Sequence, residues 1–263
     1  MSDRHTAPPA DPGAPDDAPA PRAPAHPART AAAAIATAAG LALIGGAAFG
    51  VWSDHHARQR PVTPAAAHRT AGSLWRETPI DTLFPPTLDG RGAGPGGSDR
   101  TWTRIALAPD APCATALPAA WQAPLAPTGC TRVLRATYTD ATRSSLISVG
   151  MVFTTADAPT MAALKGRLPV PSGYGFADGQ RGAWTVSVPP EAPVVLYCVS
   201  AFADGRPVAA PRPAADAVKK DDTSAVAQAG LGYEAKGVAD RIERALRALA
   251  APPTPTAKPE PSR

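Results

Sequence analysis

The sequence predicts an α+β fold: an antiparallel sheet with the element order ββαββ and then a C-terminal α-helix, with the helices covering one face of the sheet. Segments in which apolar and polar residues alternate indicate strands, and apolar residues at intervals of three and four indicate helices. An uncharged run of 23 residues before these segments predicts one transmembrane helix ahead of the domain.

The two ends of the chain are rich in proline and alanine. Residues 1–29 contain eight prolines and almost no large apolar side chains. Such a segment cannot bury enough apolar surface to offset the entropy that it would lose on ordering. The tail, residues 251–263, has the same composition. We therefore predict that both terminal segments are disordered.

The uncharged run, residues 30–52, has the length of a membrane-spanning helix, and Trp52 stands where an interfacial aromatic residue belongs. Alanine and glycine dominate the run, so a buried helix of a soluble domain and a cleaved secretory signal are alternatives. The run has no polar stripe, which argues against the first alternative. The long proline-rich segment before it favours an uncleaved signal anchor over the second.

Gly46 and Gly50 form a pair of small residues four positions apart within this run. Such a pair allows two membrane helices to approach closely, so a homodimer through the transmembrane helix is one prediction. In an alanine-rich helix the same spacing also arises by chance. Arginines flank the run on both sides in nearly equal numbers, so the positive-inside rule does not decide the orientation.

Residues 53–100 are predicted to be a juxtamembrane linker. They begin with a polar stretch, and the glycine-rich segment DGRGAGPGGSDR forms the end. No strand is expected before this segment and it contains no GK[ST] motif, so it reads as a flexible loop and not as a phosphate-binding loop. The large apolar side chains of LWRETPIDTLFPP are expected to dock on the domain that follows.

The domain, residues 101–250, opens with the strand-like segment TWTRIALA and a β-hairpin. In TRVLRATYTD, Leu134 and Tyr138 share one face, and SLISVGMVFT shows the same period of two after a turn near Asp140. A short amphipathic helix follows from Asp157, which is a typical N-cap residue.

Two more strands and a long helix complete the predicted domain. The strands are AWTVSV and PVVLYCVSAF, which two prolines separate. In YEAKGVADRIERALRALA, the residues Val238, Ile242 and Leu246 form one apolar face. Acidic and basic residues four positions apart support the same helix.

The three cysteines give information on whether the domain lies in an oxidising or a reducing compartment of the cell. Cys113 and Cys130 enclose a proline-rich loop, and a disulfide between them would stabilise the fold by about 3 kcal/mol. Cys198 lies in an apolar strand, where a free thiol behaves as a small hydrophobic group. Three reduced cysteines in a cytosolic domain remain the alternative, because spacing alone does not prove pairing. The bridge, as a hypothesis, places the domain in an oxidising extracytoplasmic space.

The whole pattern resembles a known group of proteins. A proline- and alanine-rich leader, one alanine- and glycine-rich span, and the segments CTRVLRATYTDATRSSLISVGMVFT, PVVLYCVSAFADGRP and GLGYEAKGVADRIERALR are similar to uncharacterised single-span membrane proteins of high-GC actinobacteria. The likeness covers roughly residues 30–250. It implies a single-pass membrane protein and supplies no functional residues. Membrane-tethered sensor-type domains of the same bacteria are similar in general plan only.

Histidine chemistry is not expected in the domain. All five histidines precede residue 73, so residues 73–250 contain no imidazole. This excludes a histidine general base, a Ser-His-Asp or Cys-His catalytic site and a histidine metal site from those residues. No CxxC pair suggests zinc either. We predict no catalytic residues, no metal and no cofactor. His55 and His56 are interpreted as a solvated polar flank of the membrane segment, since two adjacent histidines do not complete a coordination shell.

Two sets of residues keep other functions open. A carboxylate-dependent hydrolase would use acidic residues near turns, although such residues more often bond the local backbone. The loop PSGYGF offers Tyr174 and Phe176 for contact with a partner, although glycine-flanked aromatic residues are often loop anchors. The candidate carboxylates are Asp140, Asp178, Glu191 and Asp204.

The predicted function is binding or scaffolding without catalysis. The net charge of +4 is spread along the chain without a basic cluster, so no nucleic-acid partner is expected. The predicted partners are the lipid bilayer and an unknown protein or cell-envelope component. The predicted location is the cell membrane, single-pass, with the C-terminal domain extracytoplasmic. The alternatives are a cell-envelope hydrolase that uses carboxylates and an accessory subunit of a membrane complex.

Overall fold

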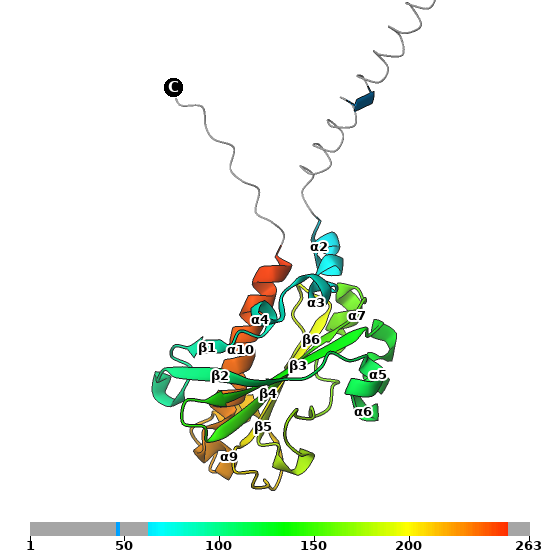
Figure 1. Ribbon diagram of the computed structural model, residues 1–263. Helices are drawn as coiled ribbons and strands as arrows, with labels where there is room; N and C mark the ends of the chain where they lie inside the picture. The colour runs from blue at the N-terminus through cyan, green and yellow to red at the C-terminus, as the bar shows by residue number, and fades with distance from the viewer. Residues whose placement is uncertain (1–45, 48–62, 252–263) are drawn as a thin grey trace, which may run out of the picture. The chain divides into compact units, whose positions relative to one another are not determined.

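A seven-stranded sheet with the strand order β1-β2-β3-β4-β6-β5-β7 is the centre of the domain (Figure 1). The computed structural model describes residues 46–47 and 63–251, and the domain is the second of these ranges. Neighbouring strands are antiparallel except β5 and β7, which are parallel. The predicted α+β class and antiparallel sheet are therefore confirmed.

The elements of the domain have the following bounds. The strands are β1 (Thr87–Gly90), β2 (Arg100–Leu107), β3 (Arg132–Asp140), β4 (Ser145–Phe153), β5 (Ala183–Ser187), β6 (Val194–Phe202) and β7 (Arg212–Pro213). The helices are α2 (Pro64–Ala71), α3 (Leu74–Glu77), α4 (Ile80–Leu83), α5 (Cys113–Ala116), α6 (Ala119–Leu125), α7 (Ala158–Ala162), α8 (Ala214–Ala217), α9 (Ala225–Gln228) and α10 (Leu231–Ala250). Three 3-10 turns are η1 (Pro95–Gly97), η2 (Ala126–Thr128) and η3 (Asp178–Gln180).

The strands that the alternating pattern predicts are present. β3 and β4 form the hairpin, with Tyr138 opposite Ile147 and Leu134 opposite Met151. β4 then pairs along its whole length with β6, and β6 pairs with β5. Two strands were not predicted, β1 and β7, which have four and two residues. Segments this short have too few residues for an alternating pattern to identify them as strands.

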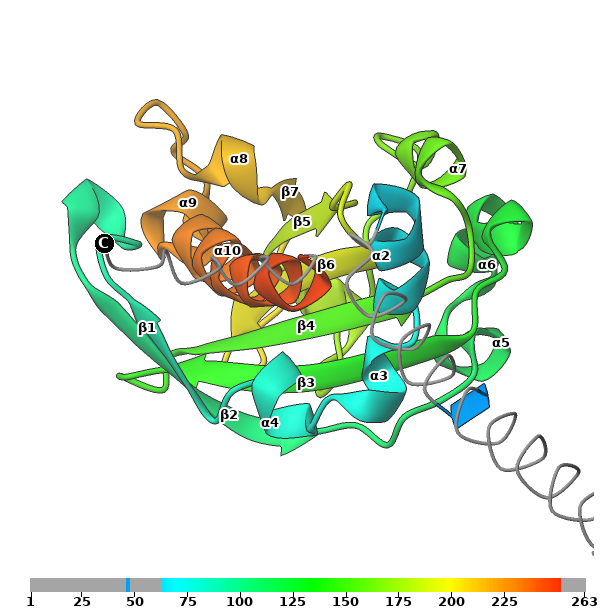
Figure 2. The ribbon, with the colours of Figure 1, turned by 90° about the horizontal axis from the view of Figure 1, so that it is seen from above.

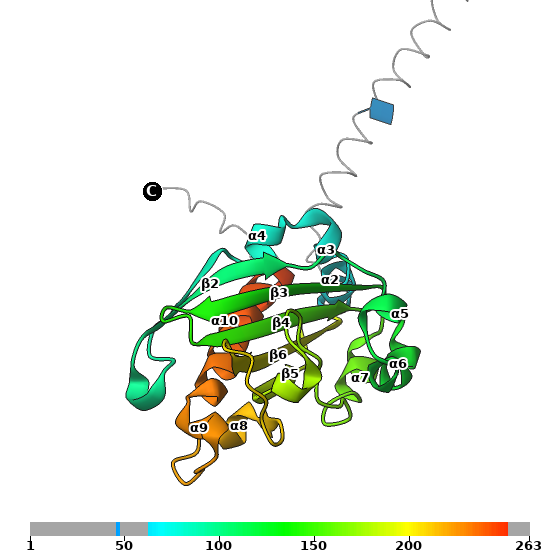
Figure 3. The same ribbon diagram turned by 60° about the horizontal axis from the view of Figure 1, so that its bottom comes forward.

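Helices cover both faces of the sheet, which corrects the prediction that they cover one face. α10 packs on the face that contains Tyr138 and Ile147, behind β3 and β4 in Figure 3. The helices α6 and α7 pack on the opposite face, with Val133 and Val152. The central strand β6 shows that both faces are covered, because all nine of its residues are buried. A continuous apolar run of this kind is typical of a strand that is covered on both sides.

The long C-terminal helix has the predicted apolar face. Val238, Ile242 and Leu246 are at most 1% exposed and lie in the core that α10 shares with the sheet. The helix begins after Gly230, whose φ of 74° lies in the left-handed region that favours glycine.

The predicted middle helix is shorter than its apolar spacing suggests. Asp157 is its N-cap, because Oδ1 accepts a hydrogen bond of 3.0 Å from the backbone N–H of Thr160. The helix α7 then has only five residues, and turns lead the chain through Gly166, which has a φ of 73°. Leu164 and Leu168 still reach the same core as α7.

The domain starts earlier than the predicted boundary at residue 101. The elements α2, α3, α4 and β1 lie within the segment that was predicted to be a linker, residues 53–100. Leu83 and Phe84 are at most 1% exposed, so LWRETPIDTLFPP docks on the domain as expected. The glycine-rich segment follows β1, a strand that was not expected there, and connects it to β2.

The membrane prediction concerns residues that lie mostly outside this description. No helix within residues 46–47 and 63–251 is both long enough and apolar enough to cross a bilayer. The predicted span, residues 30–52, is described only at positions 46 and 47, and the predicted disordered segments lie outside the described residues except for residue 251.

Candidate binding site

His68 is packed into the domain, although all histidines were predicted to precede it. It lies on α2, and only 5% of its surface is exposed. The prediction was wrong because α2 belongs to the domain and not to a linker. The sequence carries a signal for this helix: Thr63 accepts a hydrogen bond from the backbone N–H of Ala66, and Pro64 occupies the first helical position.

The imidazole of His68 has one bonded nitrogen and one nitrogen without a partner. Nδ1 lies 3.2 Å from the backbone carbonyl oxygen of Pro190. A carbonyl oxygen only accepts hydrogen bonds, so Nδ1 carries a proton, and Nε2 is an acceptor in the tautomer that has its single proton on Nδ1. Nε2 is buried and has no hydrogen-bond partner. An unsatisfied buried polar atom costs about 1–3 kcal/mol, so this one requires an explanation.

His68 lines a cavity of about 310 Å³ between α2 and the start of α7. This volume lies at the lower end of the range for small-molecule sites. The wall is mostly apolar, with polar groups at a few positions, which is the usual composition of such sites. The lining residues are Pro64, Ala65, His68, Arg69, Thr155, Asp157, Ala158, Pro159 and Pro190.

Asp157 supplies a carboxylate to the same cavity. Hydrogen bonds from Thr160 lower the pKa of Asp157 below its ordinary value. The carboxylate is therefore ionised at neutral pH and accepts hydrogen bonds only. Two acceptors, His68 Nε2 and Asp157, thus belong to residues that line one small apolar cavity. This arrangement suits a ligand that has hydrogen-bond donors and an apolar body.

In two larger cavities the arginine side chains already have acidic partners. The cavity of about 600 Å³ beside α9 contains Arg206, which is 3.2 Å from Asp204, and Arg212, which is 2.7 Å from Asp222. In the cavity of about 480 Å³ beside β5, the guanidinium of Arg247 pairs with a carboxylate on the preceding helical turn at 2.6 Å. Among the described residues, no group of three or more histidine, cysteine, aspartate or glutamate side chains is placed to hold a metal ion.

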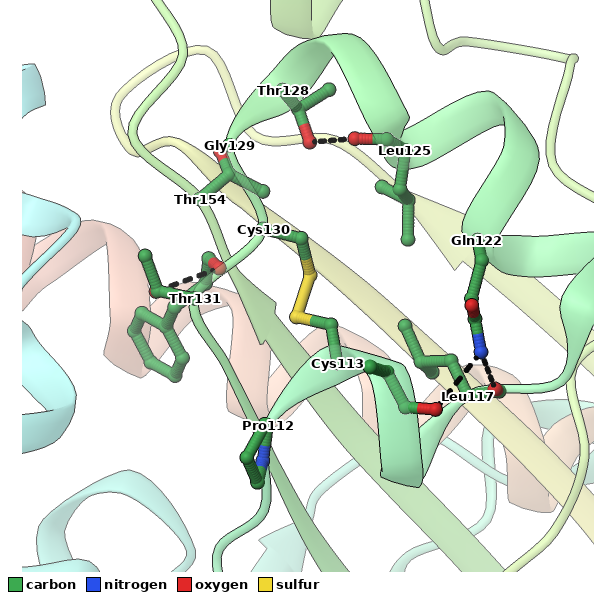
Figure 4. The surroundings of a disulfide bond; sticks show 12 residues. Pro112, Cys113, Leu117, Gln122, Leu125, Thr128, Gly129, Cys130, Thr131 and Thr154 are labelled. Carbon is green, nitrogen blue, oxygen red and sulfur yellow. Dashed lines mark hydrogen bonds between the residues drawn. A yellow bond between two sulfur atoms is a disulfide. The ribbon is translucent and has the colours of Figure 1, made fainter.

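The structure brings Cys113 and Cys130 together as a disulfide, with Sγ–Sγ 1.96 Å and Cα–Cα 6.1 Å (Figure 4). The loop that they close contains α5, α6 and η2 and packs on the second face of the sheet through Leu117 and Trp121. Hydrogen bonds inside the loop hold its turns, such as the one of 2.8 Å from Gln122 Nε2 to the carbonyl oxygen of Leu117. The bridge thus fixes one core cluster to the sheet.

Each of the four carboxylates that a hydrolase would use has a partner, which is local in sequence for Asp140, Asp178 and Asp204 and lies on α10 for Glu191. Asp178 is 3.6 Å from Arg181, Glu191 is 3.5 Å from Arg247, and Asp204 is 3.2 Å from Arg206. The remaining one, Asp140, accepts hydrogen bonds from the turn that follows it. These are the partners expected of structural carboxylates at turns.

Asp140 organises the turn between β3 and β4. Its carboxylate accepts hydrogen bonds from the Ser145 backbone N–H at 2.7 Å and hydroxyl at 2.8 Å, and from Thr142 and Ser144. Partial burial alone would raise the pKa of Asp140, but these hydrogen bonds outweigh it and lower the pKa to about 2.

Tyr174 and Phe176 lie half-buried in a loop that is anchored on the sheet. The backbone N–H of Tyr174 donates to Ser148 Oγ at 2.7 Å, and its carbonyl oxygen accepts from Thr137 Oγ1 at 2.6 Å. The phenyl ring of Phe176 covers Gly173, where an added Cβ would lie 2.3 Å from the ring. These contacts fit the loop-anchor alternative, and a partner contact stays a prediction.

The predicted helix-packing pair is only partly described. Gly46 lies in the described residues and is exposed, with no atom within 4 Å of an added Cβ. Gly50 lies outside them, so dimerisation through this pair stays a prediction.

The chain was compared with protein-family models, with curated proteins and with solved structures, and none of them matches it.

Proposed function

We propose that the chain is a single-pass membrane protein whose disulfide-bonded domain lies outside the cytoplasm and binds a small ligand beside α2. The observation that carries the binding function is the unpartnered Nε2 of His68, a residue in the wall of a 310 Å³ cavity. A ligand donor that reaches this acceptor would remove the penalty of leaving it unsatisfied.

The chemistry of the wall defines the class of ligand. The Asp157 carboxylate accepts hydrogen bonds, as does Nε2 of His68 in the tautomer that donates Nδ1–H to Pro190, so the ligand carries N–H or O–H donors. Pro64, Pro159 and Pro190 offer apolar surface for its body. The role is binding without catalysis, because each carboxylate that a hydrolase would pair already has a charged or hydrogen-bonding partner.

Two features support the location. The Cys113–Cys130 disulfide is of a kind that persists in oxidising compartments and is rare in the cytosol. The uncharged run before the domain, residues 30–52, is long enough to be a signal anchor. A reporter enzyme that folds only outside the cytoplasm, fused after Arg263, is expected to be active, and activity of a cytosolic reporter alone would contradict the proposed topology.

The binding function is tested with two histidine variants. Asn reproduces a donor near Nδ1, so His68→Asn keeps the bond to Pro190 and removes the Nε2 acceptor, whereas His68→Gln places a polar group near Nε2. Full-length protein is incubated with a small-molecule extract of the cells that produce it and studied by native mass spectrometry. We expect an adduct with the natural protein, its loss in His68→Asn, and partial recovery in His68→Gln.

The control is Gln228→Ala, which changes the separate cavity beside α9 and is expected to keep the adduct. A natural protein without any adduct, or an adduct that survives equally in His68→Asn, would contradict the assigned site.

A further inference from the structure

The large apolar side chains that stay exposed in the described residues gather along one edge of the sheet. They are Ile80 (39% exposed), Ile105 (54%) and Leu107 (37%). Ile80 begins α4, and the other two belong to the second half of β2. The helices α3 and α4 run beside β2 in both Figure 2 and Figure 3.

Specific contacts hold these segments together. Arg104 on β2 donates hydrogen bonds to Asp81 Oδ1 at 2.7 Å and to the carbonyl oxygen of Phe84, so α4 lies against β2. The guanidinium of Arg132, at the start of β3, lies 4.9 Å from the ring centroid of Trp75 on α3. We call Trp75, Arg76, Ile80, Ile105, Leu107 and Arg132 the β2-edge surface.

The outer edge of β2 is unpaired along this surface. β1 pairs with β2 only from Arg100 to Thr103, and the last backbone bond on this side of the strand is that of 2.8 Å from the Arg104 N–H to the carbonyl oxygen of Pro86. Residues 105–107 are all exposed. An unpaired apolar strand edge that is exposed to water promotes aggregation unless another layer covers it.

The composition of the β2-edge surface matches a bilayer interface. Two guanidinium groups lie over the half-buried Trp75 ring, those of Arg76 at 4.7 Å and Arg132 at 4.9 Å from its centroid. Tryptophan prefers the headgroup level of a membrane, and arginine beside it can reach lipid phosphates while its stem covers apolar surface. Ile80, Ile105 and Leu107 would contact the region below the headgroups.

The length of the chain before α2 limits where this surface can be. Residues 53–62 connect the proposed span to the domain, and ten residues extend over at most about 35 Å. α2 leads within three residues to α3, which carries Trp75. We propose that the β2-edge surface rests on the headgroup region of the bilayer that anchors the chain. This inference depends on the anchoring part of the proposed function.

The test compares two labelled positions in full-length protein reconstituted into liposomes of phosphatidylcholine and phosphatidylglycerol. A nitroxide is attached to Ile80→Cys, or to Lys220→Cys at the opposite edge of the sheet, after α8. The natural cysteines do not compete, since two are bonded and Cys198 is buried. We expect position 80 to lose access to a water-soluble nickel relaxant and to gain access to oxygen, and position 220 to remain accessible to nickel.

A second variant separates docking from local shielding. Ile105→Glu, added to the protein labelled at position 80, is expected to restore nickel access there, whereas Ala209→Glu near the opposite edge is expected to change nothing. Liposomes without phosphatidylglycerol should protect position 80 less, because Arg76 then meets no net negative lipid; Arg132 contributes less, since it already lies 3.4 Å from Asp110.

The outcomes distinguish the two proposals. Equal nickel access at positions 80 and 220, in protein that stays with the liposomes through an alkaline carbonate wash, would overturn the docking of this surface and leave the anchor standing. Protein that washes off the liposomes would overturn both the anchor and the docking.

Discussion

The indole Nε1 of Trp102 donates a hydrogen bond to the carboxylate of Glu234, across 132 positions of sequence. Trp102 on β2 is fully buried, and Glu234 in the first turn of α10 is 5% exposed. Arg100 Nε lies 3.3 Å from the other carboxylate oxygen. Gly90 and Gly237 leave room for the indole ring, since an added Cβ at either would lie within 2.5 Å of it. This contact fastens α10 to the outer part of the sheet.

Glu234→Leu is expected to lower the free energy of unfolding by about 1–3 kcal/mol, because the Trp102 N–H would be buried without an acceptor. Glu234→Gln keeps an acceptor for the indole and is expected to lose less. Chemical denaturation of the purified variants, followed by circular dichroism, measures both values. A leucine variant as stable as the natural protein would show that the bond does not hold α10 in place.

The same carboxylate predicts a pH dependence of stability. Burial raises the pKa of Glu234 above its ordinary value of 4.5, and the Trp102 hydrogen bond and the Arg100 charge offset only part of this effect. Because the folded state then holds the proton more tightly than the unfolded state, the contribution is fully present below about pH 4.5 and is lost as the pH rises through the raised pKa.

The measurement compares the natural protein with Glu234→Gln between pH 4.5 and pH 8. As the pH increases, the unfolding free energy of the natural protein should decrease relative to that of Glu234→Gln. A difference that stays constant, or one of opposite sign, would be inconsistent with a raised pKa.

Asp140→Ala is expected to reduce stability by about 1–2 kcal/mol, since the Ser145 N–H and two or more hydroxyl groups lose a charged acceptor. The matched control is Asp204→Ala in an exposed turn, where a change within about 0.5 kcal/mol is expected. Because hydrogen bonds hold the folded pKa of Asp140 at about 2, its contribution is present above the ordinary value of 3.8 and is lost as the pH falls toward 2. Equal losses in the two variants would refute the special role of Asp140.

The local patterns of the sequence were sufficient for the hairpin of β3 and β4 and for α10. In each of these elements one face carries most of the large apolar side chains, so the period alone identifies it. The pattern did not reveal that the second face of the sheet is also covered. Thr137 and Ser148 on that face are polar, yet both are buried, because they bond the backbone of Tyr174 in the loop above them.

The candidate site was missed for a different reason. His68 follows Pro64-Ala-Ala-Ala, and the polar residues around it resemble a linker, so α2 was not recognised as an element of the domain. Its burial depends on contacts with Pro190, which is 122 positions away. Partners so distant in sequence leave no periodic signal, whereas Thr63 and Pro64 do give a local signal for the start of the helix.

Reduction of the Cys113–Cys130 disulfide is expected to lower the free energy of unfolding by about 3 kcal/mol, given the 17-residue separation. The loop that it closes carries Leu117 and Trp121 into the second core cluster, so this cluster should loosen first. Protein denatured without reductant should present one thiol to alkylation, and reductant should raise the count to three. Three thiols without reductant would exclude the bridge in the native protein.

Cys198 is expected to resist alkylation in the folded protein. Its side chain is completely buried on β6, and burial raises the pKa of this thiol well above its ordinary value, so the reactive thiolate is scarce. Iodoacetamide at pH 8 should modify it only as the protein unfolds, and the rate should increase with denaturant. Rapid labelling of native protein would mean that β6 opens far more readily than its burial implies.

The two ends of the domain lie side by side, because α2 packs against α10 (Figure 2). A force applied between the chain before Thr63 and the chain after Ala251 would therefore load the contact between α2 and α10. It would not load the hydrogen-bonded strands. Under such tension the chain would peel α2 away from α10 while β3, β4 and β6 stay intact. Because His68 is part of α2, the first element to yield to force would be the one that forms the wall of the cavity.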